Sequence, residues 1–317
     1  MKKVSKGDPE RKSFVDIIKS FQEIYEDVAN ETYLKSKQEV LVLFEMLRSW
    51  VNVNLFSKYG SKEIIHSVQG VLFSYFWRAT GWIIYEIITG HYFEALRDLR
   101  FMFEGSLLAL HYDCLIDNRL YERWGYLGKF DLKAEIVELA ERLREKLRTF
   151  RKGSLEELND IVRDKVEAFV NESNVSQQEK EWYIETYTDI LSQPMFYWSI
   201  PKIISEFVKE WGLEEYEDDL KRAWAVLSLY THFSRKFFEW VLHTKPLEVF
   251  IEDYNEHLFK ICYSIFITTI DIFLSTLLVR YQKLQDIIKQ LISDWETRLS
   301  VNLNITKKML KNLKSKE

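Results

Sequence analysis

The stretch Ile261–Val279, ICYSIFITTIDIFLSTLLV, decides the fold, because so apolar a segment has to be hidden from water. It carries a single charge, Asp271, and its length approaches the roughly 20 apolar residues that cross a bilayer. Serines and threonines are frequent within it, however, which makes it polar for a helix that faces lipid. We therefore expect a core helix of a large helical protein, with no insertion into a membrane.

The composition of the whole chain favours helices. The chain has 317 residues, of which 47% are hydrophobic, and only four prolines and ten glycines. Both proline and glycine break regular elements, so their scarcity favours long, uninterrupted helices. No segment shows the alternating pattern of a strand. We predict an all-α fold, a large bundle-like body of roughly ten helices with a charged helical hairpin inserted into it.

Three long helices are expected in the N-terminal part of the chain. Proline in the first helical position and a change of periodicity place them at residues 8–30, 33–59 and 61–90. The third contains Gly70 and Gly81, which cost helix propensity. We expect these glycines to let another helix pack closely, since they lack a side chain.

The region 131–192 is more polar than the sequence on either side of it. It holds three charged amphipathic segments, and two of them open with a serine, Ser154 or Ser176, that is followed three residues later by a glutamate. That spacing is a capping box, which starts helices. We predict a main helical body formed by 1–130 and 193–317, with 131–192 as a polar helical hairpin or lid that packs on it or projects from it.

The C-terminal part continues the helical pattern and then becomes basic. We expect the segment 307–317, KKMLKNLKSKE, to fray, because chain ends without anchoring contacts are poorly ordered. The apolar positions that precede it fall on one helical face. These positions are Leu284, Ile288, Leu291, Trp295 and Leu299.

Charge and motifs exclude several classes of protein. The net charge of −5 gives no global basic footprint for nucleic acid. The two cysteines, Cys114 and Cys262, indicate no disulfide framework, which favours a reducing, cytoplasmic location. The abundance of lysine and glutamate suggests a thermophilic source. GxxxxGK[ST], GxGxxG, CxxC and HExxH motifs are all absent, so we predict neither a metal site nor a cofactor.

The first candidate site lies in Glu94–Asp113, EALRDLRFMFEGSLLALHYD. Arg97, Glu104 and His111 are seven residues apart and share one helical face. Arg100 precedes Glu104 by four residues, a spacing that forms ion pairs. Most of the segment is apolar, so these polar groups either tie helices together as a structural ion pair or line a binding cleft.

The second candidate site lies in Ala225–Lys236, AVLSLYTHFSRK. Ser228, Tyr230, His232 and Ser234 bring hydroxyl groups and an imidazole together within an aromatic-rich helix. A single histidine in such a helix is more often part of the core than a catalyst. The density of polar groups here nevertheless makes a functional role as plausible as a structural one.

The two segments together resemble a known group of proteins. The R-x-x-x-E pair followed by L-S-x-Y-x-H-x-S is similar to uncharacterised all-helical prokaryotic proteins at the edge of the HEPN-like helical families, which include defence and toxin ribonucleases. The resemblance covers about 90–127 and 220–240, on the residues Arg100, Glu104, Leu227, Ser228, Tyr230, His232 and Ser234. The hallmark ribonuclease motif of these families, an arginine four to six residues before a histidine, is absent from the chain.

Two functional hypotheses follow. The first is a binding or interaction protein that holds an anionic small molecule, nucleic acid or a partner helix at the eight candidate residues. The second is a metal-independent phosphodiester hydrolase, with His232 or Glu104 as the candidate catalytic residue and Arg97 or Arg100 steadying the phosphate. The narrow apolar faces of the amphipathic segments in 131–192 could also pair with those of a second copy, which would give a homo-oligomer.

A spatial expectation connects the two segments. Buried polar groups without partners cost about 1–3 kcal/mol each, so the economical arrangement packs the two helices side by side. Arg100 would then be held by Glu104, with its remaining donors directed at Ser228, Tyr230 or His232.

Overall fold

The computed structural model describes residues 9–52, 67–124, 130–147, 155–173, 176–231 and 254–314. Every regular element within these ranges is a helix, which confirms the all-α prediction for the described part of the chain. Three short 3-10 turns join some of the helices. The α-helices are α1 (Pro9–Lys35), α2 (Lys37–Asn52), α5 (Val68–Ile88), α6 (Tyr92–Trp124), α7 (Phe130–Leu147), α8 (Leu155–Asn171), α9 (Gln177–Leu191), α10 (Ile200–Trp211), α11 (Glu217–Thr231), α13 (Glu256–Arg280), α14 (Gln285–Leu299) and α15 (Asn304–Lys314).

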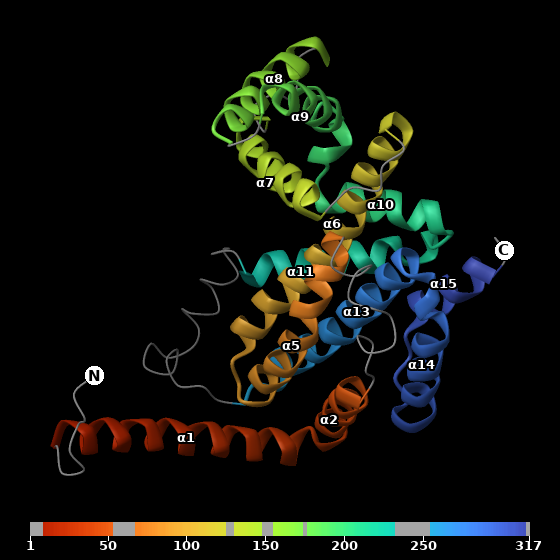
Figure 1. Ribbon diagram of the computed structural model, residues 1–317. Coiled ribbons are helices and arrows are strands. Elements are labelled where there is room, and N and C mark those ends of the chain that lie inside the picture. Colours follow the sequence, from red (N-terminus) through yellow and green to blue (C-terminus); the bar gives the residue numbers. More distant parts are fainter. Residues whose placement is uncertain are drawn as a thin grey trace.

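Helix α13 is the central element of the main body. It packs against α5, α6, α11 and α15, and Figure 1 shows it passing between these helices. All residues from Asp271 to Leu278 are buried. Among the described helices, it is the one long and apolar enough to cross a membrane, yet 72% of its most apolar window is buried inside the protein. The segment Ile261–Val279 thus supplies the core.

Asp271, the single charged residue within Ile261–Val279, caps the start of another helix. The carboxylate of Asp271 accepts hydrogen bonds from the backbone N–H groups of Ile305 (3.0 Å) and Thr306 (2.8 Å). These groups belong to the first turn of α15, where N–H groups have no partner within the helix. Burial raises the pKa of Asp271 to about 6, although the hydrogen bonds from Thr306 and Ile305 act in the opposite direction. Asp271 therefore caps α15 from inside the core.

A second buried aspartate caps α5 in the same way. Asp113, on α6, accepts hydrogen bonds from the backbone N–H groups of Val68 (2.9 Å) and Gln69 (3.0 Å). Arg280, at the end of α13, lies 3.6 Å from the same carboxylate. Ser67 is the N-cap of α5, so this helix begins later than the predicted residue 61. Two buried carboxylates thus fix the starts of two helices.

The close helix contact occurs at a different glycine from those expected. A Cβ atom added to Gly105 on α6 would lie 2.8 Å from Cζ of Phe76 on α5, closer than atoms can approach. For Gly81, the nearest atom would be Cδ1 of Leu47 at 3.8 Å, an ordinary contact. The helix pair α5 and α6 therefore depends on Gly105 rather than on Gly81 for its close approach.

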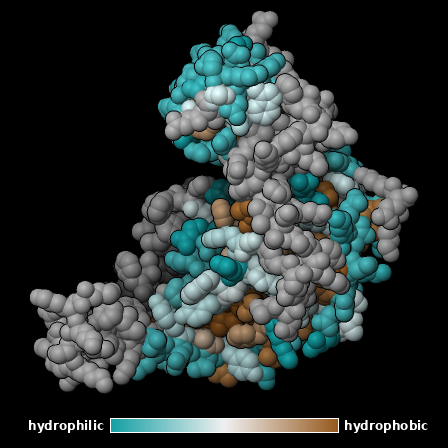
Figure 2. Space-filling view, viewed as in Figure 1, coloured by the Kyte–Doolittle hydropathy of each residue, from teal (hydrophilic) through white to brown (hydrophobic). Residues whose placement is uncertain are grey.

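The region predicted as a polar insertion forms three helices, α7, α8 and α9, with a hydrophobic cluster of their own. Figure 1 shows them together at one end of α6, and the side of them visible in Figure 2 is mostly hydrophilic. The capping box at Ser176 is present, whereas Ser154 lies outside the described residues. The boundaries 131–192 stay a prediction. The buried cluster contains Tyr112, Ile116, Ile136, Leu139, Ala140, Leu143, Leu158, Val162, Val166, Val170, Tyr187, Ile190, Leu191 and Phe196.

Two helix limits near the N-terminus differ from the prediction. Helix α1 continues to Lys35 instead of residue 30, and α2 spans Lys37–Asn52. Only Ser36 separates the two helices. The break therefore comes where Ser36, which is buried, forms a hydrogen bond of 2.9 Å with the hydroxyl of Tyr254. The predicted ends near residues 8 and 59 lie outside the described residues.

The expectation that the basic tail frays is wrong for residues 307–314. These residues belong to α15, in which Met309 and Leu313 are buried. The side-chain amide of Asn312 donates a hydrogen bond to the carbonyl of Trp211 at the end of α10 (2.6 Å). The core thus anchors α15 by its apolar face and at both ends.

The apolar stripe that the sequence predicts ahead of this tail is largely buried. Four of its five residues are buried, and the fifth, Leu299, is partly buried.

Replacing Asp271 tests the capping of α15. We expect Asp271→Ala to lower the free energy of unfolding by about 3 kcal/mol, because two buried N–H groups lose their acceptor. Asp271→Asn retains an accepting oxygen and should cost only about 1 kcal/mol. Urea unfolding measures both losses. Equal losses for the two variants would show that the acceptor is not what stabilises this site.

Candidate functional site

The two predicted polar segments do lie side by side, on α6 and α11. Arg100 donates from Nε to Oε1 of Glu104 (2.8 Å) and from Nη1 to the hydroxyl of Thr231 (2.7 Å), across 131 residues of sequence. The indole of Trp224 donates to the same oxygen of Glu104 (2.9 Å). The predicted proximity of the two segments is therefore confirmed, and Thr231, which was not among the expected partners, accepts one of these hydrogen bonds. His232, one of the expected partners, lies outside the described residues.

This arrangement is closed rather than open to a ligand. The side chains of Arg100 and Glu104 are 20% and 22% exposed, so both lie mostly within the helix interface. Glu104 neutralises Arg100, and the hydroxyl of Thr231 donates a hydrogen bond to the carbonyl of Leu227 (2.7 Å). The indole N–H of Trp224, the hydroxyl of Thr231 and two N–H groups of Arg100 therefore each have an acceptor. We describe Arg100, Glu104, Trp224 and Thr231 as the α6–α11 clamp, which ties two helices together.

Two predicted site residues of α11 lie near the clamp without joining it. The hydroxyl of Ser228 is buried and has no hydrogen-bond partner among the described residues. The ring of Tyr230 packs against Phe93, with 6.2 Å between ring centroids, and burial raises the pKa of its hydroxyl. His232 and Ser234 lie outside the described residues. Whether these four residues bind a ligand stays a prediction.

The other predicted residues of α6 are separated from the clamp. The side chain of Arg97 is 67% exposed and pairs with its neighbour Asp98, with Nε and Oδ1 3.3 Å apart. His111 lies in the interior, where Nε2 is 2.7 Å from the carbonyl of Met195 and the ring stacks on Trp198. Arg97, Glu104 and His111 share a helical face in sequence, but the structure places them in three different environments.

His111 connects α6 to the turn that leads from α9 to α10. Because a carbonyl only accepts hydrogen bonds, Nε2 of His111 carries the proton in the bond to Met195. Burial lowers the pKa of His111, and the bond to Met195 acts against this effect. The imidazole is therefore neutral, and its environment is that of a structural histidine.

Two clamp residues, Trp224 and Thr231, were missed by the sequence reasoning. They lie seven residues apart with the buried Leu227 between them, so all three fall on the face of α11 that meets α6. That spacing was available in the sequence. It was overlooked because Ser228, Tyr230 and His232 offered more conspicuous chemistry.

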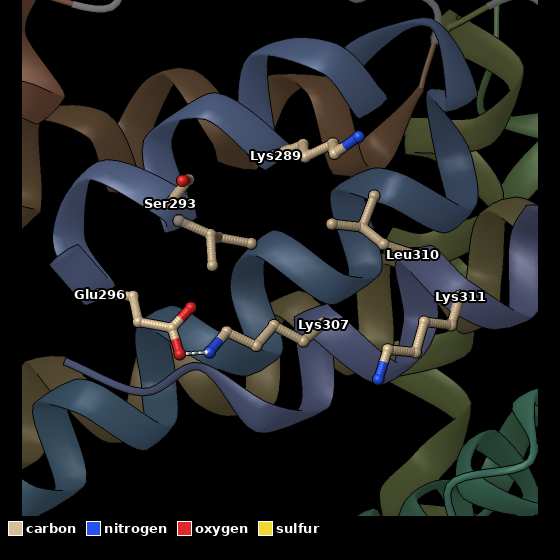
Figure 3. A pocket seen from close by; sticks show the side chains of 7 residues that line it. Lys289, Ser293, Glu296, Lys307, Leu310 and Lys311 are labelled. Carbon is tan, nitrogen blue, oxygen red and sulfur yellow. Dashed lines mark ion pairs between the residues drawn. The ribbon is translucent and has the colours of Figure 1, made fainter. Parts of the chain in front are cut away.

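A separate cavity of about 280 Å³ opens between α14 and α15. We call it the α14–α15 cleft; Figure 3 shows side chains from both helices around it. Its volume is just below the range for small-molecule sites, about 300–1,000 Å³. The residues that line it are Lys289, Ile292, Ser293, Glu296, Lys307, Leu310 and Lys311.

The lining of the cleft is basic over an apolar floor. Lys307 forms an ion pair with Glu296 that bridges the two helices, drawn as a dashed line in Figure 3. Lys289 and Lys311 are exposed and form no ion pair or hydrogen bond among the described residues. With three lysines against one glutamate, the cleft has an excess of positive charge.

The cleft was not predicted from the sequence. A signal for it existed, because Ile305, Met309 and Leu313 follow one another at intervals of four residues, as on the buried face of a helix. The many lysines of residues 307–317 favoured a frayed tail over a packed helix. No group of histidine, cysteine, aspartate and glutamate side chains in the described ranges is placed to hold a metal ion.

Comparison of the chain with models of protein families, with curated proteins and with solved structures gives no match.

Removing Glu104 tests the clamp. We expect Glu104→Ala to lower the free energy of unfolding by about 2 kcal/mol, since Arg100 loses its counter-charge and Trp224 its acceptor. The partial exposure of the pair lets water compensate for some of the loss. Glu104→Gln retains an acceptor for Trp224 and should cost about half as much. Full stability of Glu104→Ala in urea unfolding would contradict the clamp.

The buried histidine gives a pH-dependent prediction. The unfolded chain takes up a proton at His111 below its ordinary pKa of 6.5, whereas the folded chain, with a lowered pKa, resists it. Stability should therefore fall as the pH falls from about 6.5, and His111→Gln should make this fall less steep. Urea unfolding across the pH range compares the two proteins. Parallel curves would contradict the buried, neutral state of His111.

Proposed function

We propose that this chain is a binding protein for a small organic anion, held in the α14–α15 cleft. The observation that carries the proposal is a pair of lysines, Lys289 and Lys311, that come from opposite walls of a cavity and form no ion pair among the described residues. An anion between two helices can meet a cation from each of them. The hydroxyl of Ser293, on the same wall as Lys289, adds a neutral donor.

The apolar floor narrows the class of ligand. Leu310 is partly exposed beside the buried Ile292, so a ligand that lies over Leu310 removes apolar surface from water. The ion pair of Lys307 with Glu296 leaves little uncompensated negative charge to repel an anion. A carboxylate or phosphate joined to a short hydrocarbon part is the chemistry that fits these walls and this floor.

The α6–α11 clamp supports this choice of site by elimination. Its arginine is already engaged by Glu104 and Thr231, so an anion there would have to displace both partners. The hydrolase hypothesis needs an imidazole beside Arg97 or Arg100, and His232 lies outside the described residues. That hypothesis stays a prediction without an observation that favours it.

Binding of n-octyl phosphate to the full chain tests the proposal. We expect saturable binding by isothermal titration calorimetry, and about tenfold weaker binding for the double variant Lys289→Gln/Lys311→Gln. Each exposed ion pair contributes up to about 1 kcal/mol, and 1.4 kcal/mol corresponds to a factor of ten.

The matched control is Lys165→Gln/Lys209→Gln, which removes the same charge from exposed lysines of α8 and α10. This control should retain the affinity of the original chain. Inorganic phosphate should bind more weakly than octyl phosphate, because it covers no apolar floor. Absence of saturable binding, or equal weakening in the control, would overturn the proposal.

A further inference from the structure

Helix α1 extends away from the rest of the protein. Figure 1 shows its N-terminal half well apart from the other helices, while its C-terminal part lies beneath α2 and α5. Val28 and Thr32 are buried in that C-terminal part, and the ring of Tyr25 is 4.9 Å from that of His91. The helix rises 1.5 Å per residue, so the residues from 9 to 22 extend about 20 Å from this anchor.

Such an extended helix needs a partner. A helix that stands alone in water is marginally stable, because most helical stability in proteins comes from packing of an apolar face. Ile24, the last apolar residue before the anchored part, is 44% exposed although it is large and aliphatic. Within the described residues of the chain, few side chains shield Ile24 from water.

The sequence of α1 carries the repeat of a two-stranded coiled coil. Phe14, Phe21 and Val28 are spaced by seven residues, and Ile17 and Ile24 follow the first two by three. These are the a and d positions of a heptad. In an antiparallel pair, a positions meet d positions of the other helix. The register that matches Phe14 with Ile24 also matches Ile17 with Phe21, so one symmetric register satisfies both layers.

Charge selects the direction of pairing. In the half of α1 up to residue 21, three basic residues stand against two acidic ones. From residue 22 to residue 34 there are four acidic residues and no basic one, and Glu23, Glu26 and Asp27 among them are exposed. An antiparallel pair places the less acidic half of each helix beside the acidic half of the other, whereas a parallel pair places the two acidic halves together.

We infer that the partner of α1 is α1 of a second copy of this chain, in an antiparallel pair centred near residue 19. The two bodies then lie at opposite ends of the helix pair, each beyond the anchored part of its own α1. This surface is independent of the α14–α15 cleft, so the two proposals succeed or fail separately.

Sedimentation velocity of the full chain across a range of concentrations tests the inference. We expect a monomer–dimer equilibrium that Ile24→Glu weakens by about tenfold or more, because it places a charge in an apolar layer. The matched control is Leu34→Glu, on the same helix but outside the repeat, where the side chain is 79% exposed. This control should dimerise like the original chain.

The direction of pairing has its own test. Glu23→Lys/Glu26→Lys/Asp27→Lys makes both halves net positive and should weaken the dimer. Adding Arg11→Glu/Lys12→Glu to that variant makes the half up to residue 21 net negative, so the facing halves again carry opposite charges and the dimer should be restored. Circular dichroism establishes that each variant is folded. A chain that stays monomeric at all concentrations, or a dimer that Ile24→Glu leaves unchanged, would overturn the inference. Failure of the second charge change to restore the dimer would overturn the antiparallel direction.

Discussion

The fold depends on how α13 is buried. A helix of this hydropathy needs surrounding helices on every side, and it carries one carboxylate, that of Asp271, into the core. A buried charge without partners is costly, so the chain must provide hydrogen-bond donors at that depth. It does so with the first N–H groups of α15, which themselves need an acceptor. The same hydrogen bonds thus stabilise the buried carboxylate of Asp271 and satisfy the first N–H groups of α15.

This contact also explains why a cleft exists. Asp271 fixes the start of α15, and Asn312 fixes its end against α10. Helix α15 therefore lies along α14 with its apolar face turned inward and its lysines outward, which leaves the cavity between the two helices. A basic tail that frayed would have no such cavity. The candidate binding site is in this sense a consequence of the buried aspartate.

Much of the fold could be predicted from the sequence, because periodicity and rare helix breakers are local signals. The burial of α13, the capping box at Ser176 and the meeting of Arg100 with α11 all followed from spacing and from the cost of burying polar groups. The start of α5 could not be predicted, because its first N–H groups are satisfied by Asp113, which lies more than 40 residues further along the chain. Such caps depend on tertiary contacts that no short window contains.

The candidate site was predicted less well, and for a physical reason. Residue types such as arginine, glutamate and histidine indicate chemistry whether they face a ligand or another helix. The structure shows that Arg100 donates to Glu104 and Thr231, and that His111 bonds to the carbonyl of Met195. That Lys289 and Lys311 form no ion pair within the described ranges becomes visible only when their neighbours in space are known. The absence of a partner is not a property of sequence.

Native-state hydrogen exchange at the backbone amides of Ile305 and Thr306 tests most directly whether α15 is anchored to the core. Amides in the first turn of an ordinary helix exchange rapidly, since they have no acceptor within the helix. If Asp271 holds them, both should exchange as slowly as the amides of α13, through global unfolding. Rapid exchange at these two positions, beside a well-protected α13, would show that α15 is not anchored and would contradict both the cap and the cleft.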